Sequence, residues 1–379
     1  MKRRFALNFA AACLAAACAV PAMAQDAIKI ANIVELSGGG VTPGTYFRDG
    51  IKLAVNEINA AGGILGKKIV TTDMDTQTNP GVAKGLTQKA IDDGTFAIFG
   101  PVYSGSILVS MAESRRAEVP NFTGGEAAAI TAQGNPYVFR TAFGQQFSFP
   151  KIAKYMSEKY KSIAVIYQNN DFGKGGRDNI VKNLANTNTK ILAEIATEPG
   201  QVDFSSAVIR AKQANAEAVF VYLTEEESAR ILRELRKQGW SKPIIGETTL
   251  TGQKVIELAG DAANGAIGHV GLTVEAAPLK AFGAKYKAEY KSETDHNGIK
   301  GYTGMYVLKA AIEKVGKLDR KAVAAAIRGG CFSAKQTPGV LMDVCFDDKG
   351  DLDRESFLVE VKGGHQVVTA TLPPLNAKK

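Results

Sequence analysis

The chain alternates short runs of β-branched and aromatic residues with segments of helical periodicity. In one helical segment, apolar residues at Ile51, Ala54, Val55 and Ile58 recur at the spacing of a single helix face, and the pair Gly62-Gly63 then ends the helix. Strands are predicted at Ile28–Val34, Ile69–Asp73, Phe96–Phe99, Ile163–Tyr167, Ala218–Leu223, Pro243–Ile245, Ala266–Val270 and Phe357–Val361. This alternation is typical of an α/β fold, in which helices cover both faces of a parallel sheet.

The first 24 residues have the layout of a cleavable secretory signal. Lys2, Arg3 and Arg4 precede an apolar run from Phe5 to Val20, and Ala22-Met23-Ala24 stands before Gln25. We expect cleavage after Ala24, because the apolar run is shorter than the roughly twenty residues that a membrane anchor needs. A lipid anchor is the alternative, but it is not favoured. The segment therefore predicts export to the periplasm, where neither ATP nor NAD is available.

Length and charge restrict the remaining possibilities. The sequence holds 46 Lys and Arg against 38 Asp and Glu, and three of the basic residues lie in the predicted signal. The processed chain is thus only mildly basic, and its basic residues are spread along its length, which indicates neither a nucleic-acid nor a membrane-surface partner. A chain of about 355 residues is expected to form two domains.

Two cysteines remain after processing, Cys331 and Cys345. In an oxidising compartment such a pair is expected to form a disulfide, which would close a loop of about 15 residues. A redox-active or metal-binding pair is not favoured, because the spacing is not CxxC and no histidine is near.

Catalytic motifs are missing from the sequence. The histidines His269, His296 and His365 lack the paired spacing of a zinc site, and no GxSxG is present. The stretch from Gly62 to Lys68 resembles a phosphate-binding loop, but it follows a helix and lacks the final Ser or Thr, so a tight helix-to-strand turn explains its glycines better. We therefore expect no enzyme, no cofactor and no metal.

Binding is better supported, because ligands of open α/β sheets lie beyond the carboxyl ends of the strands. Small polar and aromatic residues follow several predicted strands. The Thr224 segment also matches a capping box with Glu227, which predicts a helix start there. These post-strand segments are Ser37–Gly40, Tyr103–Ser106, Thr123–Glu126, Asp171–Gly173, Thr224–Glu225 and Glu247–Thr249.

The stretch SGGGVTPGTYFRDGIKLAVNEINAAGGILGKKI, Ser37 to Ile69, resembles the opening of the leucine/isoleucine/valine-type solute-binding proteins of ABC transporters, a group with the type I periplasmic binding protein fold. Further motifs with the same resemblance follow in order along nearly all of the processed chain. They are Phe99-Gly100-Pro101, Tyr103–Ser106, Ile163–Gly173, Gly246–Thr248 and Gly301–Ile312.

The resemblance implies two doubly wound parallel-sheet lobes joined by a three-segment hinge, with the ligand cleft between them. We place the crossings near Phe143–Gln145, Gly271–Thr273 and Leu352–Arg354. Residues 25–143 plus 272–352 then form lobe 1, and residues 144–271 plus 353–379 form lobe 2. Family members close around a solute and deliver it to a membrane permease, which needs a two-state hinge.

Several residues match ligand-binding positions of the family. Ser104 matches the position whose hydroxyl holds the ligand carboxylate, and a helix start there would favour an anion, although Ser104 could instead be a plain N-cap. Phe172 falls where an aromatic ring packs against the ligand. The backbone from Gly124 to Ala127 would supply further hydrogen bonds. This segment is one residue shorter than the family pattern, so two alignments that differ by one position stay open. The candidate ligand-binding residues are Tyr103, Ser104, Gly125, Glu126, Ala127, Phe172, Thr224, Glu225, Glu247 and Thr248.

Other positions depart from the family pattern. Pro43, Thr224 and Lys300 stand where aromatic residues are expected, and Thr248 stands where the family has the acid that binds a ligand ammonium group. Glu247 is the first alternative acid and Glu225 the second, although Glu225 could simply be a favourable charge in the first turn of a helix. Glu126 is a third.

The sequence thus predicts a non-enzymatic, monomeric solute-binding protein of an ABC importer. Its ligand is a small carboxylate-bearing molecule, with an amino acid of branched-chain type as the first expectation. One alternative is an aromatic or aliphatic carboxylic acid without an ammonium group. Another is a periplasmic hydrolase, which would need a nucleophile–base pair.

Overall fold

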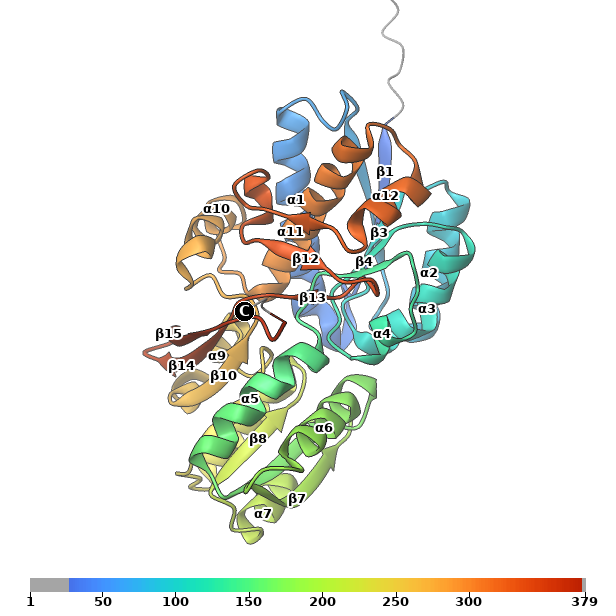
Figure 1. Ribbon diagram of the computed structural model, residues 1–379. Coiled ribbons are helices and arrows are strands. Elements are labelled where there is room, and N and C mark those ends of the chain that lie inside the picture. Colours follow the sequence, from blue (N-terminus) through green and yellow to red (C-terminus); the bar gives the residue numbers. More distant parts are fainter. Residues whose placement is uncertain (1–26, 377–379) are drawn as a thin grey trace, which may run out of the picture.

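The computed structural model describes residues 27–376, which form two α/β lobes lying one above the other (Figure 1). The signal and its cleavage site fall outside the described residues. In the upper lobe of Figure 1, lobe 1, five parallel strands pair in the order β2-β1-β3-β4-β5. These strands are β1 (Ile28–Val34), β2 (Ile69–Asp75), β3 (Ala97–Phe99), β4 (Asn121–Thr123) and β5 (Val138–Arg140). The fold class predicted from the sequence is confirmed.

Lobe 2 holds a seven-stranded sheet in the order β15-β14-β10-β9-β8-β6-β7. Its strands are β6 (Ser162–Gln168), β7 (Lys190–Thr197), β8 (Ala218–Tyr222), β9 (Ile244–Gly246), β10 (Ala266–Val270), β14 (Ser356–Lys362) and β15 (His365–Leu372). The strands from β6 to β10 are parallel, whereas β14 and β15 add antiparallel to β10. The sheet of lobe 2 is therefore mostly parallel, with an antiparallel edge made by β14 and β15. The final two strands form a hairpin, which must run antiparallel.

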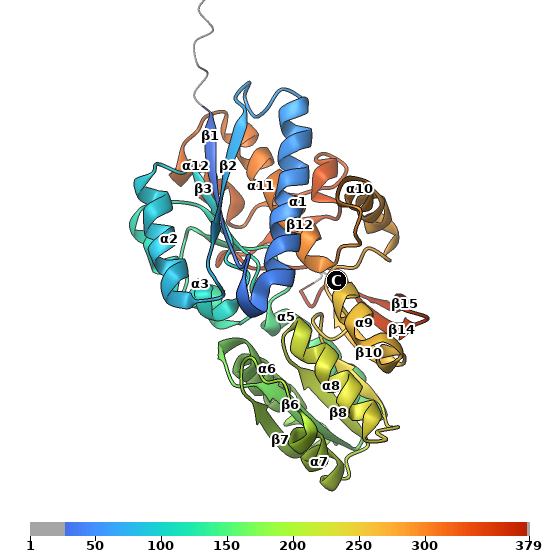
Figure 2. The same cartoon turned by 180° about the vertical axis from the view of Figure 1, so that it is seen from behind.

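Helices cover both faces of each sheet. In lobe 2, α5 and α6 lie over one face in Figure 1, and α8 and α9 lie over the other face in Figure 2. The first six helices are α1 (Val41–Ala60), α2 (Pro80–Asp92), α3 (Ser104–Arg116), α4 (Ala129–Ala132), α5 (Gln145–Lys159) and α6 (Asp171–Leu184). The others are α7 (Ser205–Gln213), α8 (Glu225–Lys237), α9 (Gln253–Ala259), α10 (Lys280–Tyr290), α11 (His296–Val315) and α12 (Arg320–Ile327). Within residues 27–376 no helix has the length and apolar character needed to cross a bilayer.

Close packing of α1 and α11 fixes one wall of the interlobe region. A Cβ atom added to Gly50 would lie 2.0 Å from the carbonyl oxygen of Gly298, and one added to Gly301 would lie 2.1 Å from the carbonyl oxygen of Phe47. Only glycine allows two helix backbones to approach so closely. The contact lies in the N-terminal part of α11, so the first turns of this helix are held rigidly at the edge of lobe 1.

The chain passes between the lobes in three places. It leaves the lobe 1 sheet after β5 and enters α5 of lobe 2, and it leaves the lobe 2 sheet after β10. It crosses again between β13 (Leu352–Asp353), which pairs with lobe 1 strand β12 (Val344–Phe346), and β14. These passages coincide with the three crossings expected from the sequence. The residue bounds of the two domains stay a prediction.

Cys331 and Cys345 are joined by a disulfide between β11 (Cys331–Phe332) and β12, which pair antiparallel at these two residues. The double variant C331S/C345S is expected to lower the free energy of unfolding by about 3 kcal/mol, because the loop between the cysteines is no longer closed in the unfolded chain. Chemical denaturation without reductant measures this loss. Addition of reductant to the unmodified protein is the control, and a variant as stable as the parent would contradict the expectation.

Candidate functional site

A cavity of about 740 Å³ opens between the lobes, at the carboxyl ends of strands of both sheets. Its wall includes the start of α3 from lobe 1, the starts of α6 and α8 from lobe 2, and the first residues of α11. This position is the one expected for ligands of open α/β sheets. Seven of the ten candidate residues line the cavity: Tyr103, Ser104, Gly125, Glu126, Phe172, Thr224 and Glu225.

The α3 side of the cavity presents Ser104 at the first residue of a helix. Tyr103, and not Ser104, is the N-cap of α3, so a plain capping role for Ser104 is wrong. The Ser104 Oγ atom accepts a hydrogen bond of 3.2 Å from the backbone N–H of Ala127. The Ser104 hydroxyl hydrogen can therefore donate to a ligand. The first N–H groups of α3 have no partner within the helix, and they lie at the positive end of the helix dipole. This end of the cavity suits an anion.

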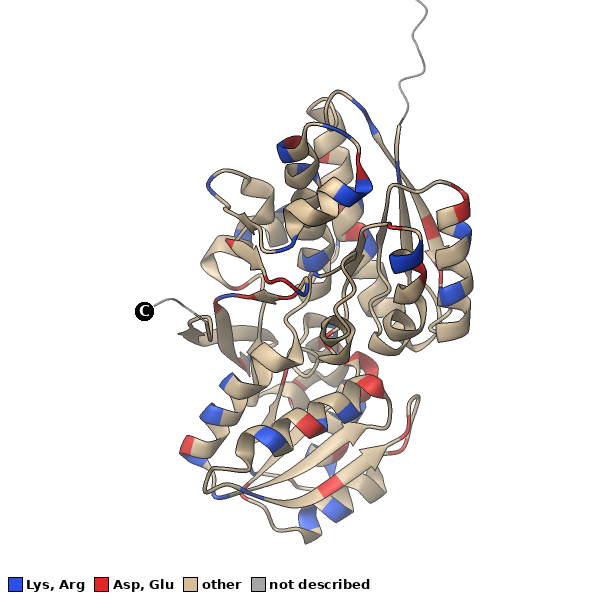
Figure 3. Cartoon of the chain, turned by 45° about the vertical axis from the view of Figure 1, so that its right-hand side comes forward, with Lys and Arg blue, Asp and Glu red and all other residues tan. Residues whose placement is uncertain are grey.

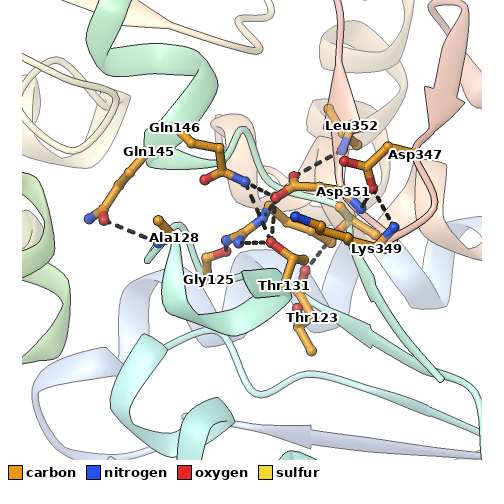
Figure 4. A network of polar contacts seen from close by, with 12 residues as sticks. Thr123, Gly125, Ala128, Thr131, Gln145, Gln146, Asp347, Lys349, Asp351 and Leu352 are labelled. Atoms are coloured by element: carbon orange, nitrogen blue, oxygen red, sulfur yellow. Dashed lines mark hydrogen bonds and ion pairs between the residues drawn. The ribbon is translucent and has the colours of Figure 1, made fainter. Parts of the chain in front are cut away.

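The loop that carries Gly125 and Ala127 is fixed by a buried arginine. Arg140 Nε donates to Asp351 Oδ1 at 3.0 Å, and its Nη2 donates to the carbonyl oxygen of Ala127 at 2.9 Å. Its Nη1 donates to the carbonyl oxygen of Gly125. Figure 4 shows this network, which also includes Thr131. Ala127 does not line the cavity, and its contribution is the hydrogen bond to Ser104.

On the lobe 2 side, Phe172 and Tyr222 form an aromatic pair. Their ring centroids lie 4.1 Å apart and the rings are nearly parallel. The Tyr222 hydroxyl donates across the cleft to Glu126 Oε2 at 3.3 Å. Thr42 Oγ1 of lobe 1 likewise donates to Glu226 Oε1 of lobe 2 at 2.8 Å. The two lobes are therefore in direct contact on either side of the cavity.

Thr224 and Glu225 begin α8 as the sequence predicts, but the capping box does not form. The Thr224 hydroxyl donates to Glu227 Oε2 at 3.0 Å, and the Thr224 side chain does not cap the helix. Glu227 also accepts from the N–H of Gly200, so its carboxylate is drawn away from the Thr224 backbone. The hydrogen bond between the two side chains of Thr224 and Glu227 thus takes the place of the two side-chain-to-backbone bonds of a capping box.

Glu225 is a buried carboxylate that forms no ion pair within residues 27–376. It is 3% exposed and lines the cavity, and no hydrogen bond joins it to another of the described side chains, while its own backbone N–H and the charge of Lys300 partly offset the effect of burial. Burial, together with Glu226 and Asp295, raises the pKa of Glu225 to about 8. A buried carboxylate without a partner is costly, so a cationic group in the cavity would relieve that cost.

Glu247, the first alternative acid from the sequence, lies elsewhere. Neither it nor Thr248 lines the cavity, whereas the next residue, Thr249, does. Glu247 contacts His269 Nδ1 at 3.0 Å, and His269 Nε2 contacts Ser356 Oγ at 2.9 Å. Burial raises the pKa of Glu247 well above its usual range and lowers that of His269 to about 3. This group is a buried hydrogen-bonded chain.

A third set of cavity residues was only partly visible in the sequence. Lys300 lines the cavity beside Asn297 and His296, all on the first turns of α11. In the sequence, Lys300 stands out only as a departure from the family pattern, and no motif marks Asn297 or His296 as a binding residue. Asp295 caps this helix by accepting from the backbone N–H of Asn297, and such an Asp before a helix was the available signal.

Comparison with known proteins agrees with this architecture. The family model described as "Periplasmic binding protein" matches residues 27–366. The leucine-, isoleucine-, valine-, threonine- and alanine-binding protein of Pseudomonas aeruginosa is 27% identical over 344 residues, covering 89% of this chain and 90% of the relative. A Leu/Ile/Val-binding protein of Rhizobium johnstonii is 29% identical over 350 residues, covering 91% and 94%.

Solved structures give the same result. A branched-chain amino acid transporter substrate-binding protein from Streptococcus pneumoniae, in complex with isoleucine, has a TM-score of 0.80 and 27% identity, covering 92% of this chain and 99% of that one. A solute-binding protein of Rhodopseudomonas palustris in complex with benzoate has a TM-score of 0.84 at 22% identity, covering 92% and 97%. That second likeness bears on the fold alone. With a family model spanning nearly all of the described residues, the chain belongs to the periplasmic binding protein family.

Proposed function

We propose that this chain is the extracytoplasmic solute-binding protein of an ABC importer, without catalytic activity of its own. It captures a small ligand with a carboxylate, an amino acid in the first instance, by closure of the two lobes, and delivers it to a membrane permease. Export to the periplasm and a monomeric state belong to the same proposal. The curated relatives named above support it, and branched-chain amino acids are the first ligands to test.

The observation that carries the amino-acid assignment is a pair of complementary groups on facing walls of the cavity. The start of α3 with Ser104 suits a carboxylate, and Glu225 of lobe 2 forms no ion pair with a described side chain. Both groups line one cavity, Ser104 from lobe 1 and Glu225 from lobe 2. An α-amino acid carries a carboxylate and an ammonium group, the two groups that these walls complement. Its binding would use both lobes, which is what closure requires.

A carboxylic acid without an ammonium group is the second candidate. The raised pKa of Glu225, about 8, means that this side chain is largely protonated at neutral pH in the ligand-free protein. A protonated Glu225 needs no cation and can donate a hydrogen bond. The benzoate complex of the Rhodopseudomonas palustris protein is an example of such a ligand in this fold.

A hydrolase would need a nucleophile and base that reach substrate. Ser356, His269 and Glu247 have the hydrogen-bond order of a serine-hydrolase triad. However, Ser356 and His269 are each 0% exposed and neither lines the cavity. Lys151 Nζ also donates to Ser356 Oγ at 2.8 Å. These contacts support a structural role for the group and not a catalytic one.

The test of the proposed function is calorimetric titration of Ser104→Ala beside the unmodified protein. The ligands are a panel of amino acids and their deaminated analogues. We expect the substitution to weaken carboxylate binding by about 1.5–3 kcal/mol, because a charge-assisted hydrogen bond is lost. Thermal melts check that the fold is intact. Unchanged affinity would end the assignment of Ser104, and absence of binding across the whole panel would end the proposed function.

A further inference from the structure

The wall of the cavity around α11 is polar and incompletely hydrogen-bonded. We call Glu126, Asn297 and Lys300 the polar wall; these three residues line the cavity and are 7%, 1% and 3% exposed. Lys300 Nζ donates to Asn297 Oδ1 at 3.3 Å, to the carbonyl oxygen of Gly124 at 3.3 Å and to Glu126 Oε1 at 3.5 Å. All three contacts are longer than the 2.7–2.9 Å of a strong charge-assisted hydrogen bond, so the ammonium group is free to turn toward a ligand oxygen.

Asn297 provides a second donor. Because its Oδ1 accepts from Lys300, its amide nitrogen Nδ2 is the remaining polar atom. Nδ2 is buried and makes no well-aligned hydrogen bond within residues 27–376, although the Asn297 side chain lies close enough to the Asp295 carboxylate to act against the rise in its pKa that burial causes. Buried polar atoms in folded proteins are almost always paired. A buried donor on the wall of a cavity without a well-aligned acceptor thus indicates that a ligand atom completes it.

The wall of the same cavity holds no long aliphatic side chain among the described residues. Its apolar side chains are Val41, Pro43, Pro80, Val102, Phe172 and Pro199. Of these, Val41, Pro80 and Pro199 are exposed, which leaves three buried ones. No Leu, Ile or Met side chain from residues 27–376 lines the cavity. A branched aliphatic side group placed against the polar wall would cover Asn297 Nδ2 and give it no acceptor.

We infer that the side group of the ligand is polar and uncharged, a primary amide or a hydroxyl, and that it binds to the polar wall. Its oxygen accepts from Lys300 Nζ and Asn297 Nδ2, and its N–H or O–H donates to Glu126. A second carboxylate is disfavoured, because Glu126, Asp295 and Glu225 all act on Lys300. The inference rests on the proposed function, and it replaces the branched-chain side group with a polar one.

Ligand pairs of nearly equal shape test the inference on the unmodified protein. The pairs are leucine with asparagine, valine with threonine, and benzoate with 4-hydroxybenzoate, each titrated by calorimetry; aspartate tests a charged side group. Sites built to hydrogen-bond a ligand reject the analogue that lacks the group, so within a pair that binds we expect the polar member to bind on the order of a hundredfold tighter or more. Aspartate is expected to bind more weakly than asparagine.

The outcomes separate the inference from the proposed function. If an apolar member or aspartate binds as tightly as the polar partner, the inference is overturned while the proposed function stands. If no member of any pair binds, the carboxylate-ligand proposal and the inference both fall.

A double variant tests the residues themselves. In K300M/E126Q the polar wall loses one positive and one negative charge together, and the polar preference is expected to fall at least tenfold. R230M is the matched control, since Arg230 is the other Lys or Arg lining the cavity and lies on α8 of the opposite lobe. Its polar preference should stay unchanged. A double variant that is folded by its thermal melt and keeps the full preference would overturn the assignment to the polar wall.

Discussion

Replacing Arg140 by methionine is expected to lower the free energy of unfolding by about 3–5 kcal/mol, because the change leaves a buried charge without its partner. Arg140 is 0% exposed and Asp351 is 1% exposed. Thr131 Oγ1 donates to Asp351 Oδ2 at 2.6 Å, but a hydroxyl supplies no positive charge. The carbonyl oxygens of Gly125 and Ala127 lose a donor at the same time. Chemical denaturation of the ligand-free protein measures the effect.

The matched control for this variant is R140M/D351N, in which both charges are absent. Replacing a whole buried ion pair by neutral groups is often close to neutral, so the double variant should recover much of the loss. A single variant within about 1 kcal/mol of the parent would contradict the expectation. Ligand affinity of the double variant is a second measurement. Arg140 positions the Gly125–Ala127 loop, and the N–H of Ala127 in that loop donates to Ser104.

Charged residues outside the cleft contribute less to the stability of the fold. In Figure 3 the basic and acidic segments are interspersed over both lobes, which agrees with the spread of Lys and Arg along the sequence. Exposed ion pairs such as Lys89 with Asp93 contribute little, since solvent screens them. Arg140 differs because its partner is buried, and no property of the sequence marks it out from the other arginines.

Most of the fold could be predicted, because long buried strands leave a clear pattern. The strand β1 begins and ends where its apolar run does, and it lies between β2 and β3 in the sheet. The strands β4 and β5 are only three residues long, too short for any periodicity. The edge strand β7 was not predicted, because Glu194 interrupts its apolar residues and exposed residues alternate with more buried ones along it.

The candidate site was harder to predict because neighbouring residues point in different directions. The sequence places Glu247, Thr248 and Thr249 together after β9. Of the three, Thr249 lines the cavity and Glu247 turns to His269 on the adjacent strand β10. These residues form a turn, closed by the hydrogen bond from the N–H of Leu250 to the carbonyl oxygen of Glu247. Successive side chains of a turn point in different directions, so a difference of one residue decides which side chain faces the ligand. Sequence spacing alone does not contain that direction.

Glu225→Gln is expected to weaken binding of an amino acid ligand and to change binding of its deaminated analogue little. The physical reason is that a buried ammonium group needs a compensating charge, and Glu225 is a buried carboxylate of the cavity that forms no ion pair with the described residues. Breaking a desolvated charge pair typically costs 2–5 kcal/mol, or a loss of roughly thirtyfold or more in affinity. Glu234→Gln is the control, because Glu234 lies on the same helix, α8, and does not line the cavity.

The pH dependence of ligand affinity is an independent test of Glu225. Burial raises the pKa of Glu225 to about 8, so below that pH an ammonium ligand must displace a proton. Affinity should therefore rise with pH and level off above about pH 8, by up to tenfold per pH unit. Burial also raises the pKa of Asp295, to about 6, so the rise between pH 7 and 8 belongs to Glu225. In Glu225→Gln this rise should be absent.

The stability of the ligand-free protein should change in the opposite direction. The pKa of Glu225 is higher in the folded chain than its ordinary value of 4.5, so folding takes up a proton, and the contribution of Glu225 to stability is lost as the pH rises from about 4.5 to 8. Denaturation at several pH values, compared between the parent and Glu225→Gln, isolates this contribution. If the deaminated analogue binds the parent more tightly than the amino acid does, with no rise toward pH 8, the ligand carries no ammonium group and a carboxylic acid is the ligand of this cleft.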